Sequence, residues 1–213
     1  MNRIHRTAAA ALSALLLSFV PAGCGGDDEG GGGSADVGDN DAGLVACVGD
    51  SITEGDNCEG APYPARLAAM CGKRVANYGV GGAESSYGAA EIGSVLSRRP
   101  GFVCILFGAN DCIMGRPVET TVQNLRRIVQ ACKNNGSRAI VATPTPMVGI
   151  HEKFNDAVDR LVPAVKAMAK EEGVPCIDLN AAFGSGAGLL GPDGLHMTEA
   201  GSDLIAKKFN SRL

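Results

Sequence analysis

The sequence predicts an α/β protein in which a parallel sheet carries helices on both faces. Five short apolar runs alternate with longer segments whose apolar residues recur at helical spacing. The runs are continuously hydrophobic, which is typical of strands covered on both sides. Polar blocks follow three of these runs directly. This placement fits a parallel sheet, because ligands bind beyond the carboxyl ends of its strands.

The five apolar runs are the predicted strands. Right-handed crossovers between parallel strands favour a doubly wound order, with helices on both faces of one sheet. In chain order the strands are expected at Leu44–Val48, Arg74–Tyr78, Phe102–Phe107, Arg138–Thr143 and Pro175–Leu179.

Helical spacing is clearest in the segments before and after the fourth run. Pro163 interrupts the second of these segments, so its helix is predicted to kink or restart near Asp159–Leu161. A final helix is expected from a cap at Thr198 to Asn210. The two apolar series are Val118, Val122, Leu125, Val129 and Cys132, and then Phe154, Val158, Leu161, Val165 and Met168.

The chain is predicted to begin with an export signal. Arg3 and Arg6 precede an apolar run that is too short to span a bilayer, so residues 1–23 are expected to be a signal peptide. Ala22-Gly23-Cys24 resembles the end of a bacterial lipoprotein signal, which implies lipidation of Cys24 and an envelope protein held to a membrane by that anchor alone. An ordinary cleaved signal and a secreted protein are the alternative.

Two segments follow the signal. Residues 24–43 are rich in Gly and acidic residues, with almost nothing to bury, and are predicted to be a flexible linker. Residues 44–213 are long enough to form one domain with its own core. The domain is therefore expected to be tethered at a distance from a membrane.

Composition limits the possible partners. The formal net charge is −4 and Lys and Arg form no basic stripe, which argues against nucleic-acid binding. The chain has no Trp and only 4% aromatic residues, so a large stacking platform for polysaccharide is not expected. No C-x-x-C pair occurs and His is scarce, so a zinc site is not predicted.

Cysteines downstream of Cys24 are expected to pair in part, because an exported protein meets an oxidising environment. Those in strand runs are predicted to be buried as small apolar residues, and the others are disulfide candidates. Pairing of Cys58 with Cys112 is expected because each closely follows a polar block. The strand cysteines are Cys47, Cys104 and Cys176, and the candidates are Cys58, Cys71, Cys112 and Cys132.

A nucleophile, a base and an acid can be assigned from the blocks. Ser51 follows the first strand in Gly49-Asp50-Ser51-Ile52 and needs a base to remove its proton. His196 is the preferred base, because Asp193 three residues earlier can reach its Nδ1 across a turn and fix its tautomer. His151, in the loop after the fourth strand, is also expected to lie near the site.

Three donors are expected to stabilise the oxyanion of a tetrahedral intermediate. They are the backbone N–H of Ser51, the backbone N–H of Gly82 and the side-chain amide of Asn110. Gly82 suits this role because no side chain blocks the approach to its N–H.

The four blocks together resemble those of the SGNH hydrolases, also called the GDSL esterase/lipase family. They are Gly49-Asp50-Ser51-Ile52, Asn77 to Gly82, Gly108 to Asp111, and Asp193 to His196. The resemblance implies a flavodoxin-like three-layer α/β/α sandwich of five parallel strands, with no metal or cofactor. It also implies the same roles for Ser51, Gly82, Asn110, Asp193 and His196. Ala83-Glu84 departs from the Asp-Thr often found there.

A serine esterase is the leading functional interpretation. Its expected substrates are small acyl esters or acetylated sugars, because the segments between blocks leave little material for a lid, and lysophospholipids remain open. An acyltransferase or deacetylase acting on envelope or extracellular glycans would use the same residues. A binding module on the same fold is the third interpretation.

Overall fold

The computed structural model describes residues 36–213. The predicted signal peptide 1–23, the lipidation site Cys24 and most of the predicted linker 24–43 lie outside the described residues. Within residues 36–213, no helix is long and apolar enough to cross a membrane.

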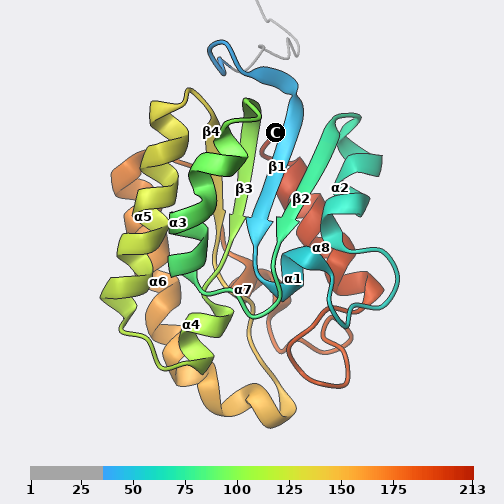
Figure 1. Ribbon diagram of the computed structural model, residues 1–213. Coiled ribbons are helices and arrows are strands. Elements are labelled where there is room, and N and C mark those ends of the chain that lie inside the picture. The colour runs from blue at the N-terminus through green and yellow to red at the C-terminus, as the bar shows by residue number, and fades with distance from the viewer. Residues whose placement is uncertain (1–35) are drawn as a thin grey trace, which may run out of the picture. The chain divides into compact units, whose positions relative to one another are not determined.

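Five parallel strands form one sheet in the order β2-β1-β3-β4-β5, as Figure 1 shows. This order is doubly wound, because the chain moves outward from β1 first to one side and then to the other. The predicted fold class is confirmed. The strands are β1 (Asp41–Gly49), β2 (Arg74–Gly79), β3 (Pro100–Leu106), β4 (Arg138–Ala142) and β5 (Cys176–Ile177).

Helices cover both faces of the sheet. Figure 1 shows α3, α5 and α6 side by side on one face and α2 and α8 together on the other. Every residue of β3 is buried, as the continuous apolar run predicted. The covering helices are α2 (Tyr63–Cys71), α3 (Ser85–Leu96), α5 (Val118–Asn134), α6 (Asn155–Glu172) and α8 (Glu199–Asn210).

Short helices lie where the strands end. Three of them, α1, α4 and α7, follow β1, β3 and β5 directly (Figure 1). A 3-10 helix, η1, follows the loop after β4. Their bounds are α1 (Ser51–Glu54), α4 (Ala109–Ile113), α7 (Leu179–Phe183) and η1 (Gly149–Phe154). The carboxyl edge of the sheet therefore holds the polar blocks.

Two boundaries differ from those expected. The strand β1 begins at Asp41, and Val37 before it is buried, so the folded unit reaches into the predicted linker. The helix α6 runs through Pro163 without a restart. Val158, Leu161 and Val165 on either side of the proline are buried in the core. Their packing maintains the helix where the proline removes one backbone donor.

The cysteines of the described residues do not pair. All seven in residues 36–213 are free, so the disulfide predicted between Cys58 and Cys112 is wrong. Cys112 is buried on α4, and the Cys58 thiol instead donates to the Gly60 carbonyl at 3.3 Å. The strand residues Cys47 and Cys104 are fully buried neighbours on β1 and β3, as expected of small apolar residues.

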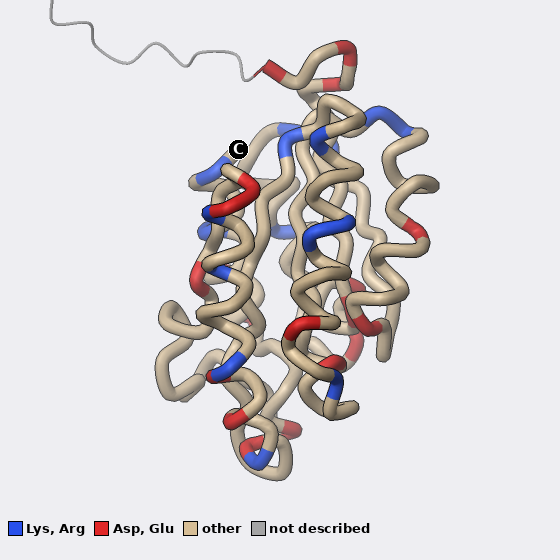
Figure 2. The backbone as a smooth tube through the Cα atoms, turned by 90° about the vertical axis from the view of Figure 1, so that its left-hand side faces the viewer, with Lys and Arg blue, Asp and Glu red and all other residues tan. Residues whose placement is uncertain are grey.

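Charged residues of both signs are interspersed along this part of the chain, as Figure 2 shows. Several form ion pairs between neighbouring elements, such as Arg126 on α5 with Glu171 and Glu172 on α6. Arg66 on α2 pairs in the same way with Asp203 on α8. These contacts join helices of the same layer.

Candidate active site

Ser51 is the first residue of α1 and follows β1 without a loop. Asp50 caps this helix, because its carboxylate oxygen Oδ1 accepts the Ile52 N–H at 3.0 Å. The turn needs a glycine at position 49, since a Cβ there would lie 2.0 Å from Thr53 Oγ1 and 2.5 Å from the Leu106 carbonyl. Strand, cap and helix together fix the position of Ser51.

The end of β2 supports α1 from the side. Asn77 donates from Nδ2 to the carbonyls of Thr53 at 2.8 Å and Glu54 at 3.2 Å. A Cβ on Gly79 would lie 2.0 Å from the Glu54 nitrogen, so the two backbones touch there. The sequence alone did not indicate this role of Asn77. Its only signal was an amide side chain two residues before a glycine at the end of a strand.

Asp193 and His196 meet in the turn before α8. The Asp193 carboxylate accepts the N–H groups of Leu195 at 3.0 Å and His196 at 2.9 Å through Oδ1. Its other oxygen, Oδ2, lies 2.6 Å from His196 Nδ1. Burial opposes ionisation of Asp193, but the hydrogen bonds from the His196 ring and from these two N–H groups outweigh it and lower its pKa.

The turn brings the His196 ring against Ser51. His196 Nε2 lies 3.0 Å from Ser51 Oγ, and both residues are buried. Because the ionised Asp193 only accepts hydrogen bonds, His196 Nδ1 carries the ring proton of the neutral imidazole. Nε2 is then free to accept the Ser51 hydroxyl proton. The three side chains form one hydrogen-bonded chain.

His151, the other histidine of the described residues, lies beside this turn without reaching Ser51. Its Nδ1 is 2.8 Å from the Asp193 carbonyl oxygen, to which it donates. Next to it, the Val148 N–H donates to the Gly194 carbonyl at 2.9 Å. Gly194 has φ +74°, and a Cβ there would lie 2.0 Å from the Val148 carbonyl oxygen. The segment before and within η1 thus supports the turn that carries Asp193 and His196.

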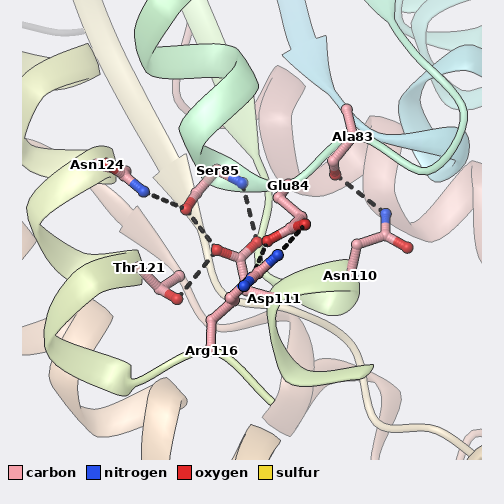
Figure 3. Close-up of polar contacts among 8 residues, drawn as sticks. All are labelled: Ala83, Glu84, Ser85, Asn110, Asp111, Arg116, Thr121 and Asn124. Carbon is pink, nitrogen blue, oxygen red and sulfur yellow. Dashed lines mark hydrogen bonds and ion pairs between the residues drawn. The ribbon is translucent and has the colours of Figure 1, made fainter. Parts of the chain in front are cut away.

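The predicted oxyanion donors follow three strands at the same edge of the sheet: Ser51 begins α1, Gly82 lies in the loop after β2 and Asn110 lies on α4. Within residues 36–213, the backbone N–H groups of Ser51 and Gly82 have no hydrogen-bond acceptor. Gly82 is exposed with φ +72°, in the left-handed region that favours glycine. Asn110 uses one amide hydrogen to reach the Ala83 carbonyl at 3.1 Å (Figure 3). Its other amide hydrogen is available to a ligand.

Asp50, directly before Ser51, is a buried carboxyl group, whereas Asp193 is only partly buried. The Asp50 Oδ2 has no hydrogen-bond partner among the described residues. The pKa of Asp50 is raised to about 7, mainly by burial and in smaller part by nearby Asp111, whereas the Ile52 N–H and His196 act in the opposite direction. The group therefore changes charge near neutral pH.

Within the part of the chain that the structure describes, no group of three or more His, Cys, Asp or Glu side chains is arranged to hold a metal ion. The polar groups around Ser51 instead form a set of proton acceptors and N–H donors. This set suits nucleophilic attack by a hydroxyl on an acyl carbon.

Residues 47–204 match the GDSL-like Lipase/Acylhydrolase family. The match covers most of the chain and includes all four polar blocks. The chain therefore belongs to this family, a class of ester-bond hydrolases.

Individual relatives agree with the family match. The chain is 27% identical over 203 residues to an acetylxylan esterase of Xylanibacter ruminicola, an alignment that covers 78% of this chain and 42% of that relative. The chain thus spans less than half the length of this relative.

Two solved structures show the same fold. One is a catalytic mutant of an acetylxylan esterase from Geobacillus stearothermophilus, with a TM-score of 0.69, 22% identity and coverage of 84% of this chain and 94% of that chain. The other is a lipase/acylhydrolase from Enterococcus faecalis, with a TM-score of 0.67, 25% identity and coverage of 80% and 96%.

Proposed function

We propose that this protein is a serine esterase that hydrolyses carboxylic esters through an acyl-enzyme on Ser51. One observation carries the proposal: Asp193 Oδ2 lies 2.6 Å from His196 Nδ1, and His196 Nε2 lies 3.0 Å from Ser51 Oγ. This is the order in which a carboxylate orients an imidazole and the imidazole removes a hydroxyl proton.

The reaction has two halves. In the first, Ser51 Oγ attacks the ester carbonyl as its proton moves to His196 Nε2, and His196 then gives that proton to the departing alcohol. In the second, His196 takes a proton from water, which attacks the acyl group, and Ser51 regains its proton when the carboxylic acid leaves. Ionised Asp193 stabilises the imidazolium that forms in each half.

The oxyanion in both halves is assigned to the N–H groups of Ser51 and Gly82 and to the free amide hydrogen of Asn110. Two of these donors are unused within the described residues. Loss of one such donor typically costs about 10²–10³ in kcat.

The substrate class is inferred to be small acyl esters, acetylated sugars in particular. Two proteins to which this chain is similar carry the name acetylxylan esterase. Hydrolysis and acyl transfer share the steps up to the acyl-enzyme. An acetylated oligosaccharide offered with a second glycan distinguishes them, since hydrolysis releases free acetate and transfer acetylates the second glycan.

We also propose that the domain is an exported protein anchored through lipidated Cys24, as residues 3–24 of the sequence suggest. The test is the mass of the protein from a bacterial host. A diacylglyceryl-modified N-terminal Cys24 supports the anchor, and a cleaved but unmodified N-terminus refutes it.

The test of the esterase proposal is Ser51→Ala assayed on a short-chain aryl ester. Turnover is expected to fall to background while the thermal unfolding midpoint, Tm, stays close to that of the wild type. Full turnover by the folded variant would refute the assignment of Ser51.

A further inference from the structure

A buried carboxylate that the proposed mechanism does not use lies behind the candidate oxyanion donors. Asp111 is 2% exposed and accepts hydrogen bonds from the Ser85 N–H at 2.9 Å, the Ser85 hydroxyl at 2.5 Å and the Thr121 hydroxyl at 3.0 Å. Asn124 extends the network by donating to Ser85 Oγ at 3.1 Å. Figure 3 shows these side chains converging between α3, α4 and α5.

The network joins the two segments that carry the loop donors. Asp111 directly follows Asn110, and Ser85 is the first residue of α3, three residues after Gly82. The Asn110 amide adds a second connection by donating to the Ala83 carbonyl at 3.1 Å. Gly82 and Asn110 therefore each lie close in the chain to hydrogen bonds that join their two segments.

A third connection lies at the surface. Arg116 donates from Nε to Glu84 Oε2 at 2.5 Å and from Nη2 to Oε1 at 3.0 Å, a two-bond pairing visible in Figure 3. The Arg116 guanidinium lowers the pKa of Glu84. Glu84 stands in the part of the block that departs from the usual family pattern. Three consecutive residues, 83 to 85, thus each contact the 110–116 segment.

Gly82 itself donates no hydrogen bond within residues 36–213, although it lies in a turn that the Ala83 N–H closes by donating to the Val80 carbonyl at 3.0 Å. A Cβ built on Gly82 would meet none of the described atoms within 4 Å. Its φ of +72° lies in the left-handed region that favours glycine. An oxyanion donor works only when its direction is set before the reaction. The restraint on Gly82 must therefore come from its neighbours.

Resting on the proposed function, we propose that Asp111 is the main positioning residue of the oxyanion site and that the Glu84–Arg116 pair is a weaker second one. Asp111 holds Ser85, and through it the Gly82 loop, at a fixed distance from Asn110. Its bonds are buried and shielded from water, whereas the Glu84–Arg116 pair is partly exposed. The two contributions should therefore differ in size.

The first test is Asp111→Asn. In this variant the amide oxygen can keep the bond from the Ser85 N–H, but the amide nitrogen then faces the Ser85 and Thr121 hydroxyls, so both hydroxyls lose the acceptor that they have in the wild type. We expect kcat and kcat/KM on an aryl acetate to fall together by about tenfold to a hundredfold, with KM unchanged. A Tm drop with unchanged kcat, measured well below that Tm, would show a structural role only and overturn the inference.

A milder pair of variants covers the case in which Asp111→Asn does not fold. Thr121→Val removes one donor to Asp111 and keeps the shape, and is expected to lower kcat by about threefold to tenfold. Thr121→Ser keeps the hydroxyl and is expected to restore the wild-type kcat. Equal kcat values for the two variants would contradict the inference.

The surface pair is tested by Glu84→Gln, with Glu171→Gln as the matched control. Each substitution removes one carboxylate that pairs with an arginine. Glu171, however, pairs with Arg126 between α6 and α5, away from the segments that carry Gly82 and Asn110. We expect kcat to fall by about twofold to fivefold for Glu84→Gln only. Equal effects of both substitutions would remove Glu84 and Arg116 from the proposal.

Failure of the inference can be distinguished from failure of the proposed function. Wild-type protein that neither hydrolyses the aryl acetate nor reacts with a serine-directed phosphonate would refute both. Active wild-type protein together with full kcat in folded Asp111→Asn would refute the positioning role alone.

Discussion

At the residue scale, the ring nitrogen of His196 that carries the proton determines whether Ser51 can react. Asp193 is held ionised by the His196 ring and two backbone N–H groups, and it keeps the ring proton on Nδ1. The proton acceptor Nε2 is thereby directed at Ser51. A neighbouring carbonyl could hold the ring equally well, but only a carboxylate can also stabilise its positive charge.

Asp193→Asn tests this point. The asparagine oxygen is expected to keep the two backbone N–H bonds, so its amide nitrogen would face His196 Nδ1. The ring proton then moves to Nε2, which can no longer accept from Ser51. We expect kcat to fall by about 10³–10⁴-fold with little change in Tm. A loss smaller than tenfold, measured by initial rates on the aryl ester, would show that Asp193 does not set the tautomer.

Asp50 gives a second prediction at this scale, and its sign follows from the raised pKa. The folded protein holds the Asp50 proton up to about pH 7, whereas the unfolded chain releases it near its ordinary pKa of about 3.9. The stability contributed by this proton is complete below the unfolded pKa and is lost as pH rises through the folded pKa.

Asp50→Asn removes this loss of stability, because an amide does not ionise, and it keeps the side-chain oxygen that caps α1. The stability of the variant relative to the wild type should therefore be greater at pH 8 than at pH 5. The Tm of both proteins, measured at both pH values, tests this. A Tm difference between the two proteins that stays constant, or shrinks with rising pH, would contradict the assignment.

At the element scale, α3 links the sheet to the oxyanion loop, and two of its glycines have opposite surroundings. A Cβ on Gly88 would lie 2.5 Å from the buried Phe107 ring, whereas a Cβ on Gly93 would meet nothing within 4 Å. The first glycine allows the helix to approach β3. The second only adds flexibility to the unfolded chain.

Alanine substitutions at these two positions should have opposite effects. Gly93→Ala is expected to stabilise the protein by about 0.5–1 kcal/mol, because alanine loses less entropy in a helix. Gly88→Ala is expected to destabilise it by about 1–3 kcal/mol through overpacking. The free energy of unfolding in urea measures both. Equal effects at the two sites would show that α3 does not pack as described.

Sequence patterns predicted elements well where the signal was local. The apolar runs indicated all five strands, and Thr198 caps α8 at the expected place, accepting the Gly201 N–H at 3.1 Å. The helix α6 does not restart at Pro163, because the effect of the proline depends on the packing of Val158, Leu161 and Val165. The early start of β1 was missed because Gly and Asp suggested a linker, whereas Val37 is buried and Asn40 donates to the Asn135 carbonyl at 2.7 Å.

At the scale of the whole domain, four distant blocks meet because parallel strands end at one edge. Sequence reasoning could therefore place Ser51, Gly82, Asn110 and His196 near one another. It could not find the Asp111 network or the His151 contact with Asp193, since both depend on how helices and loops far apart in the chain pack together. The predicted disulfide failed for the same reason, because the burial of Cys112 is a property of the packed layers.

The free cysteines give a prediction for the whole domain. Without any reductant, all seven thiols of residues 36–213 should react with a maleimide in urea, whereas the buried Cys47, Cys104, Cys112 and Cys132 should be protected in the native state. Mass spectrometry counts the adducts. Fewer than seven adducts in urea would show that some of these thiols are not free and would contradict the free state of all seven.

The most direct measurement of the catalytic assignment is the site at which a serine-directed phosphonate attaches to the intact protein. Peptide mapping should find a single adduct, on Ser51, and its formation should be abolished in Ser51→Ala and strongly slowed in His196→Ala. An adduct on another residue, or active protein that hydrolyses esters with Ser51 unlabelled, would contradict the proposed chain of Asp193, His196 and Ser51.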